Sequence, residues 1–118
     1  MKVNISEKFE KIAKIYNPKI VGELNGQYVK LVKFKGPFIW HKHDNEDEMF
    51  LVTKGSFRME FRDHSEDINA GEFIIVPRGV EHRPVADEEV EVILFEPATT
   101  LNTGDQEHEL TQRELERI

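Results

Sequence analysis

Short β-prone runs, separated by turn-forming residues, make up most of this chain. From Lys19 onward, segments rich in Val, Ile, Leu and Phe alternate with Gly, Pro, Asn and Asp. Asn25-Gly26 and Lys54-Gly55 are tight-turn signals between runs. The segment 57–62 alternates strictly between apolar and charged residues, which places one face of a strand in the interior. The pattern predicts an all-β body, either a sandwich or a barrel, between which periodicity alone does not decide.

One helix is expected before the first run. Apolar residues recur there at helical spacing: Ile5, Phe9, Ile12, Ala13 and Tyr16. We expect a helix over 6–16, which Asn17-Pro18 ends because the residue before a proline is pushed out of the helical region. The strands are expected over 19–24, 27–34, 38–43, 48–53, 56–61, 67–69, 73–76, 82–85 and 90–96.

The length of 118 residues is the usual size of one domain. We therefore expect a single domain over 1–118, with an N-terminal helical segment over 1–17 and a β-barrel over 19–97. A polar tail follows over 98–118. Its last part, 102–118, is expected to form either a short helix or a frayed end, because its apolar residues are too sparse to define a buried face.

Composition limits the partners of the chain. Its formal net charge of −7 repels phosphate backbones and anionic lipid, so we expect neither nucleic acid nor a membrane as a partner. Cysteine is absent, which excludes disulfides, thiolate ligands and a cysteine nucleophile. The N-terminal residues show no apolar core followed by a cleavage site, and no window is apolar enough to span a bilayer. We therefore expect a soluble, cytoplasmic protein.

Two histidines lie two residues apart in a strand-like run. Side chains alternate along a strand, so His41 and His43 of an extended 38–43 segment point to the same face. After a polar turn, Glu48 begins the next run and can reach back toward both imidazoles across a hairpin. Glu46 and Asp47 lie in the same acidic turn, and each is an alternative to Glu48 as the carboxylate.

A third histidine ends the segment that runs from Gly71 to His82. A buried-looking run leads there into a Pro77-Arg78-Gly79 turn, which would aim the histidine. Three imidazoles and one carboxylate suit a single divalent transition metal, Fe, Mn, Ni, Co, Cu or Zn, and ligand type does not distinguish among these. The predicted metal ligands are His41, His43, Glu48 and His82.

The spacing of these residues resembles that of the cupin superfamily. The two cupin motifs occur here as G-x4-HxH-x4-E-x6-G from Gly36 to Gly55 and as G-x5-P-x-G-x2-H from Gly71 to His82. The sequence departs from the family pattern at two positions, neither of which is a ligand. The interval before the first histidine is one residue shorter, and Ala86 stands where the family usually has Asn.

The resemblance implies a fold and an assembly. Cupins form a double-stranded β-helix, or jelly-roll barrel, with the metal inside one mouth, commonly as a homodimer. Small single-domain cupins with such motifs are often called mannose-6-phosphate-isomerase-like. We take that label as a statement about fold, because function has to be argued from the site.

Other conspicuous side chains have ordinary explanations. His64 and His108 lie in polar segments and are expected in solvent. Trp40 has the opposite parity to the two neighbouring histidines, so in a regular strand it faces away from the metal, toward packing or a subunit contact. Arg78 and Arg83 are minor candidates to meet an anionic substrate. Several apolar residues are expected to form plain core, and some of them to line the pocket: Phe50, Val52, Phe57, Met59 and Phe61.

The expected site favours chemistry on a small chelating molecule. Four protein ligands leave two positions of a six-coordinate metal for a substrate with adjacent oxygens, such as a hydroxy-keto acid, enediol, diketone or aldose. We expect a metal-dependent enzyme with dioxygenase-type or isomerase-type chemistry on a small oxygenated metabolite, although no catalytic base stands out. The alternative is a non-catalytic binding or sensing module. A third interpretation makes the metal structural, but a structural site would be closed by its protein ligands.

Overall fold

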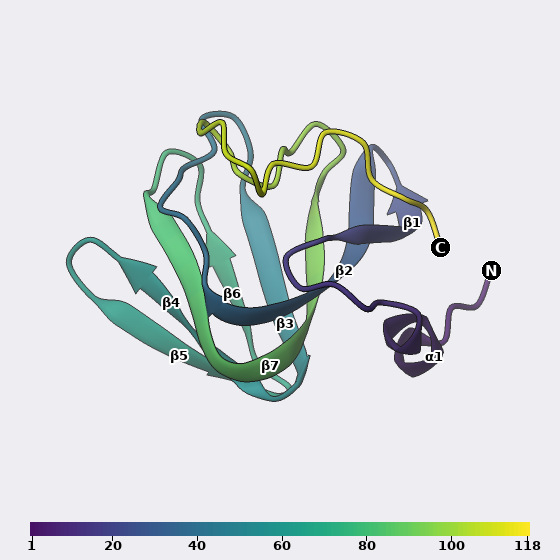
Figure 1. The fold of residues 1–118 in the computed structure, drawn as a ribbon. Coiled ribbons are helices and arrows are strands. Elements are labelled where there is room, and N and C mark those ends of the chain that lie inside the picture. The colour runs from purple at the N-terminus through teal and green to yellow at the C-terminus, as the bar shows by residue number, and fades with distance from the viewer.

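The computed structural model describes residues 1–118 as one helix and seven strands: α1 (Ile5–Glu10), β1 (Lys19–Leu24), β2 (Gln27–Pro37), β3 (Glu48–Lys54), β4 (Ser56–Phe61), β5 (Ser65–Asn69), β6 (Phe73–Val76) and β7 (His82–Pro97). All strand pairs are antiparallel, in the order β1-β2-β7-β3-β6, and β4 pairs with both β5 and β7. The strands curl round a common interior (Figure 1), so the predicted all-β cupin barrel with a short N-terminal helix is confirmed. The single helix is too short to cross a membrane.

One long strand, β7, connects the two sides of the barrel. It pairs with β2 from Val85 to Pro97, while its first part also pairs with β4 and its later part also pairs with β3. The sequence predicts two strands here, over 82–85 and 90–96, because the polar run between them looks like a loop. The residues of 87–89 are indeed exposed, but their backbone stays extended. A register shift opposite, between Phe34 and Gly36, lets the paired strands bend at this point.

The segment over 38–43 is not the regular strand that the sequence predicts. Its only ladder contact is an isolated bridge between His41 and His82, with N···O distances of 3.1 and 2.9 Å. Phe38 N adds one further hydrogen bond, to the carbonyl of Pro84. The segment therefore stays beside the start of β7 but makes too few hydrogen bonds to form a regular strand.

The helix is shorter than predicted, because the apolar pattern after Glu10 reflects burial and not helical backbone. Asn4 caps the helix by accepting a hydrogen bond from Glu7 N at 3.0 Å. Beyond the helix, Ile12 packs on the outside of the sheet. Tyr16 adopts a left-handed backbone with φ 53° and turns instead into the barrel interior.

The core lies on both faces of the sheet. Inside the barrel, aromatic rings stack on one another: Tyr16 lies 5.0 Å from Phe34 and 4.7 Å from Phe38 between ring centroids. The five residues expected in the core all pack inside the barrel, with Phe61 only partly buried. Outside, Phe9 and Ile12 of the N-terminal segment cover β2 and β7. Burial of each large apolar side chain contributes about 1.5–3 kcal/mol, so both faces stabilise the fold.

The C-terminal tail forms neither a helix nor a frayed end. It runs over one mouth of the barrel in yellow (Figure 1) and ends beside β1. There Ile20 N donates to Glu116 O at 2.9 Å, and Ile118 N donates to Ile20 O at 3.0 Å. Midway along the tail, Leu110 packs against the interior core, and Thr103 is fully buried. The tail is thus a cover held by backbone hydrogen bonds and by scattered side-chain contacts, which hydrophobic periodicity does not reveal.

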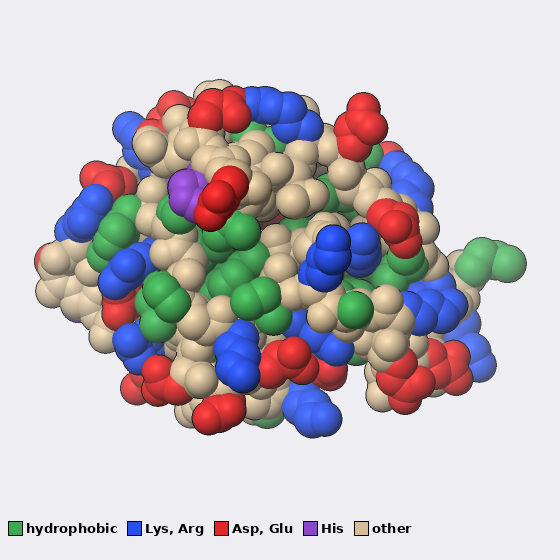
Figure 2. Space-filling view, in the orientation of Figure 1, with side chains coloured by type: hydrophobic (Ala, Val, Ile, Leu, Met, Phe, Trp, Pro, Cys, Tyr) green, Lys and Arg blue, Asp and Glu red, His purple; other side chains and the backbone are tan.

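Charged side chains of both signs are mixed over the surface. Figure 2 shows one face, on which acidic and basic groups surround a central set of hydrophobic side chains. Several surface charges are paired, such as Arg62 with Glu81 at 2.9 Å and Arg117 with Glu23 at 3.3 Å. Exposed pairs of this kind contribute little to stability, so burial of the core supplies most of it.

Candidate metal centre

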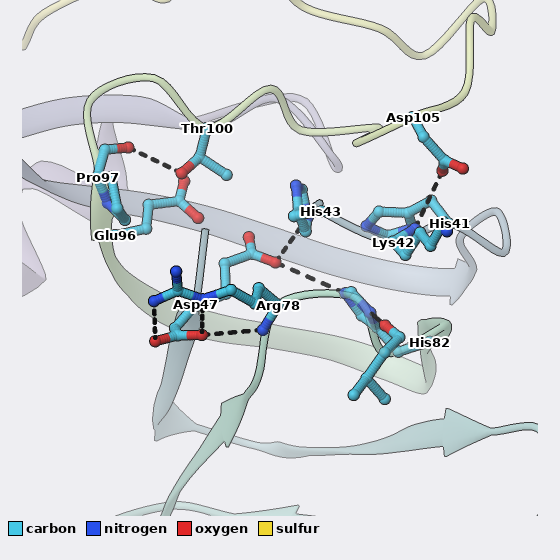
Figure 3. Close-up of polar contacts among 12 residues, drawn as sticks. His41, Lys42, His43, Asp47, Arg78, His82, Glu96, Pro97, Thr100 and Asp105 are labelled. Carbon is cyan, nitrogen blue, oxygen red and sulfur yellow. Dashed lines mark hydrogen bonds and ion pairs between the residues drawn. The ribbon is translucent and has the colours of Figure 1, made fainter. Parts of the chain in front are cut away.

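The structure brings the four predicted ligands together at one place inside the barrel. All four side chains are buried, and their ligand atoms lie within 4.8 Å of one another. His41 and His43 come from the segment between β2 and β3, while Glu48 begins β3 and His82 begins β7. The cluster therefore joins three separate parts of the chain (Figure 3).

Backbone contacts aim two of the imidazoles. The Nδ1 atom of His41 donates to the carbonyl of Ile39 at 2.8 Å, and Nδ1 of His82 donates to the carbonyl of Val80 at 2.9 Å. With the proton held at Nδ1, each Nε2 carries a lone pair, the form in which an imidazole binds a metal. The turn before β7 is fixed as well, because Gly79 N donates to the carbonyl of His43 at 2.7 Å.

Glu48 lies between two of the histidines. Its Oε1 atom is 2.9 Å from Nε2 of His43 and 3.6 Å from Nε2 of His82. These three atoms are buried, and none makes a contact with hydrogen-bond geometry. Buried polar atoms normally have partners, and nitrogen and oxygen donors that converge in this way suit a divalent transition metal. The residues therefore fit one such ion, whose identity the donor set does not fix.

The electrostatics of His41 and Glu48 agree with their roles as ligands. Burial, together with the neighbouring His82, lowers the pKa of His41 to about 4, so its ring is neutral at neutral pH. Burial alone would raise the pKa of Glu48, but the adjacent side chains of Glu96, His43 and His82 hold it well below its usual range. Burial lowers the pKa of His43 too, yet its contact with Glu48 outweighs burial and raises it overall. A neutral imidazole and an ionised carboxylate are the forms that bind metal.

The two alternative carboxylates lie outside the cluster. Asp47 is exposed and accepts a hydrogen bond from Arg78 N at 2.9 Å. Glu46 accepts one from the hydroxyl of Thr99 at 2.8 Å. Each is thus engaged with the neighbouring loop or tail, and Glu48 is the carboxylate that faces the imidazoles.

A small cavity adjoins the cluster. Its volume is about 30 Å³, which is room for roughly two water molecules. His41 and Glu48 form one wall, and Asn102 of the C-terminal tail lies at another. The other walls are almost entirely apolar or aromatic: Tyr16, Pro18, Val32, Phe34, Phe38, Phe50, Pro84 and Leu94. The space beside the cluster is therefore small and mostly apolar, apart from His41, Glu48 and Asn102.

Three residues near the cluster are absent from the sequence prediction of the site. Tyr16 lines the cavity, and its hydroxyl donates to the carbonyl of Gly36 at 2.5 Å. Lys30 and Glu96 form a buried ion pair at 2.7 Å, close to Glu48. The available signal for the ion pair was parity, because Lys30 and Glu96 each lie on the inward face of a strand, where a charged residue interrupts an apolar series. Tyr16 lies before β1, outside any strand, and gave no such signal.

The remaining candidates are not part of the cluster. Trp40 lies away from it, with the guanidinium of Arg62 4.0 Å and that of Arg83 5.1 Å from the ring centroid. Arg83 pairs with Glu60 at 2.8 Å, and Arg78 pairs with Asp47. Neither arginine lines the cavity. His64 and His108 are exposed, as expected.

Residues 31–96 match the family described as the cupin domain. The match covers more than half of the 118 residues and includes all four clustered side chains. Together with the antiparallel barrel, it shows that the chain belongs to the cupin family.

Individual relatives agree with this assignment. A cupin-2 domain containing protein from Shewanella frigidimarina NCIMB 400 is 39% identical, with a TM-score of 0.79 over 80% of this chain and 93% of that one. Protein NMB1881 from Neisseria meningitidis is 28% identical, with a TM-score of 0.77 over 83% of this chain and all of that one. The uncharacterized protein YdbB of Bacillus subtilis is 33% identical over 64 residues, 53% of this chain. This chain spans only 57% of YdbB.

Proposed function

We propose that His41, His43, Glu48 and His82 bind one divalent transition metal, and that this cupin is an enzyme acting on a small oxygenated metabolite that chelates the metal. The observation that carries the proposal is the convergence of buried donor atoms without partners beside a small apolar cavity. A ligand set that faces a cavity leaves room for a substrate, whereas a structural metal is enclosed by its protein ligands.

The cavity restricts the substrate. Its apolar walls favour a compact, uncharged body, and the chelating oxygens of such a substrate would face the cluster. When bound, the metal would supply Lewis-acid chemistry, which lowers the pKa of a hydroxyl or of an adjacent C–H group. The cavity offers no lysine or arginine for a phosphate group. We therefore do not extend the mannose-6-phosphate-isomerase label to the substrate of this chain.

Two reaction classes remain open, dioxygenase-type and isomerase-type, and both depend on the identity of the metal. The experiment is to load the protein separately with Fe(II) and Mn(II) and to incubate it with a panel of α-hydroxy ketones, diketones and catechols. Oxygen uptake reports the first class, and isotope exchange seen by NMR reports the second. The His41→Ala/His82→Ala variant is the matched control. Turnover by the wild type alone supports the enzyme.

The alternative function is a module that binds or senses a small ligand without reaction. Metal-dependent affinity for a member of the same panel, with no product from any member, would favour this alternative. Failure of the protein to bind either metal would contradict both. The absence of nucleic-acid or membrane partners remains a prediction that rests on the acidic composition, and the cytoplasmic location likewise remains a prediction.

We also propose that the chain is a homodimer. β6 lies at an edge of the sheet, pairs only with β3, and carries four consecutive apolar residues without a charge to block further pairing. Phe73 and Ile75 of this strand are 59% and 54% exposed. A second copy that packs on this edge would cover both side chains.

A further inference from the structure

The C-terminal tail contains a loop that is hydrogen-bonded mainly to itself, residues 101–113, which we call the lid. The side chain of Asn102 donates to the carbonyl of Leu110 at 2.9 Å and accepts a hydrogen bond from Gln112 N at 2.8 Å. Two threonine hydroxyls of the same loop lie 2.7 Å apart. These contacts tie the two ends of the lid together, as in a compact Ω-loop. The lid is therefore a self-contained unit.

Few contacts join the lid to the barrel. Asp105 N donates to the carbonyl of Lys42 at 3.0 Å, and Lys42 N donates to Oδ1 of Asp105 at 3.1 Å. Figure 3 shows Asp105 reaching Lys42 beside His41. We call this reciprocal pair the latch, because no other hydrogen bond or ion pair links the lid to the rest of the chain. Leu110 also packs against the interior core, so that opening must withdraw one apolar side chain.

The chain on either side of the lid is held separately. Before the lid, the carbonyl of Thr100 accepts a hydrogen bond from the buried Lys30 at 3.4 Å. After the lid, Ile20 exchanges backbone hydrogen bonds with Glu116 and Ile118. Breaking the latch would therefore free the middle of the tail and leave both of its flanks in place.

The lid lies between two spaces that border the metal centre. Asn102 lines the inner cavity, and Gly104 and Asp105 line an outer hollow of about 200 Å³ that His43 also lines. Pockets that bind small molecules usually enclose about 300–1,000 Å³. The inner cavity of about 30 Å³ is therefore too small for a metabolite while the lid is in place. Displacing the lid would remove the wall between the two spaces.

We propose that the lid gates the metal centre: it closes over the inner cavity through the latch and swings away to admit a small molecule. This inference rests on the proposed function, because a substrate that chelates the metal has to reach the buried cluster. A segment with so few contacts to the barrel opens at a lower free-energy cost than the barrel itself. Loops that close over a bound substrate also shield it from water.

Cysteine labelling measures the opening, because the chain has no cysteine of its own. Val32→Cys places a thiol in the wall of the inner cavity, and Val52→Cys places one in the core away from it; both positions are 1% exposed. The probe is methyl methanethiosulfonate, a small uncharged reagent, applied to the full-length protein with a metal chelator present. We expect Val32→Cys to react at least about 10-fold faster than Val52→Cys. Its rate should change little in low urea, because opening of the lid exposes little surface.

A further change tests the latch. Asp105→Ala removes one of its two hydrogen bonds, so in the Val32→Cys background it should raise the labelling rate about 2–10-fold. Glu109→Ala is the matched control, because Glu109 is an exposed acid of the lid without a hydrogen bond or ion pair. We expect it to leave the rate within about twofold. Thermal melting checks that each variant is folded.

Two labelling results would overturn the inference. Equal rates with equal urea dependence at the two thiols would show that the cavity opens only when the barrel unfolds. Equal rates for Asp105→Ala and Glu109→Ala would show that the latch does not hold the lid closed.

Hydrogen exchange of the wild type decides the matter if a cysteine variant does not fold. The Asp105 amide should exchange at least about 10-fold faster than the Val52 amide, which donates to the carbonyl of Glu72 at 3.0 Å. Equal protection of the two amides would contradict the lid. None of these measurements needs a metal, so failure of the lid is distinguishable from failure of the proposed function, which metal binding tests.

Discussion

The Oε1 atom of Glu48 lies 2.9 Å from Nε2 of His43, and both atoms are buried without a hydrogen-bond partner. A carboxylate and an imidazole in this arrangement are two donors facing one point, which a cation can occupy between them. This contact joins the segment after β2 to the start of β3. The distance between the two donor atoms therefore depends on the path of the loop between them.

Replacement of Glu48 by Gln should weaken metal binding strongly. The amide keeps the size of the side chain but removes its charge, so we expect a loss of at least about 100-fold, above that typical of outer-shell partners. Competition with a colorimetric chelator measures the affinity. The neighbouring Asp47→Asn is the matched control, because Asp47 is exposed and pairs with Arg78. Equal effects of the two changes would count against Glu48 as the ligand.

Lower pH should destabilise the metal-free protein through His41. Its pKa is about 4 in the folded state, against 6.5 for an ordinary histidine. Between these values the unfolded chain binds a proton at this ring and the folded chain does not, so the free energy of unfolding falls as pH decreases from 6.5 to 4. The loss attributable to this group is about 3 kcal/mol.

Urea denaturation across this pH range, compared with the His41→Asn variant, isolates the contribution of the one imidazole. The wild type should lose stability more steeply than the variant as the pH is lowered. Parallel curves for the two proteins would show that His41 is protonated in the folded state like an ordinary histidine.

Replacement of Gly104 by Ala should disturb the tail over the barrel mouth. Gly104 has φ +58°, and a Cβ there would overlap the carbonyl of Lys42 and lie 3.1 Å from Cδ2 of His41. Gly71→Ala is the matched control, because that glycine also has a positive φ, +86°, but open space around its Cβ position. We expect Gly104→Ala to cost about 1–3 kcal/mol more than the control in the free energy of unfolding. Equal losses in the free energy of unfolding for the two variants would mean that the tail does not lie close against Lys42 and His41.

Polar substitution of the β6 edge should separate the proposed dimer. Phe73→Ser/Ile75→Ser removes the two most exposed side chains of that strand, so light scattering should report a monomer for the variant and a dimer for the wild type. Leu24→Ser is the control, because Leu24 is 49% exposed on a different edge strand and should leave the dimer intact. A monomeric wild type would remove the basis for the homodimer.

Local patterns in the sequence predict most of the strands. Three of them, over 19–24, 56–61 and 73–76, have the predicted bounds, since turn residues flank each run. The polar segment over 87–89 misleads because solvent-exposed residues can remain extended when the residues on both sides of them pair with the same strand, β2. The predicted helix is longer than the observed one, because the periodic apolar residues after Glu10 pack on two different faces of the sheet and not along one face of a helix.

Motif spacing predicts which residues form the candidate site, but the sequence does not predict the local backbone structure that brings them together. His41 and His82 converge as predicted, but they do so through an isolated bridge and not along a regular strand. The buried ion pair of Lys30 and Glu96 was not predicted, because pairing between residues so distant in sequence depends on the register of β2 against β7. The position of the tail depends likewise on backbone hydrogen bonds that carry no side-chain pattern.

The most direct test is the metal content of the protein itself. Wild type purified without a histidine tag or added metal, and then reconstituted with each candidate ion in turn, should hold close to one transition-metal ion per chain by elemental mass spectrometry. The His41→Ala/His82→Ala variant, treated identically and shown to be folded, should hold almost none. A wild type that retains no metal after reconstitution, or a variant that retains as much as the wild type, would contradict the account.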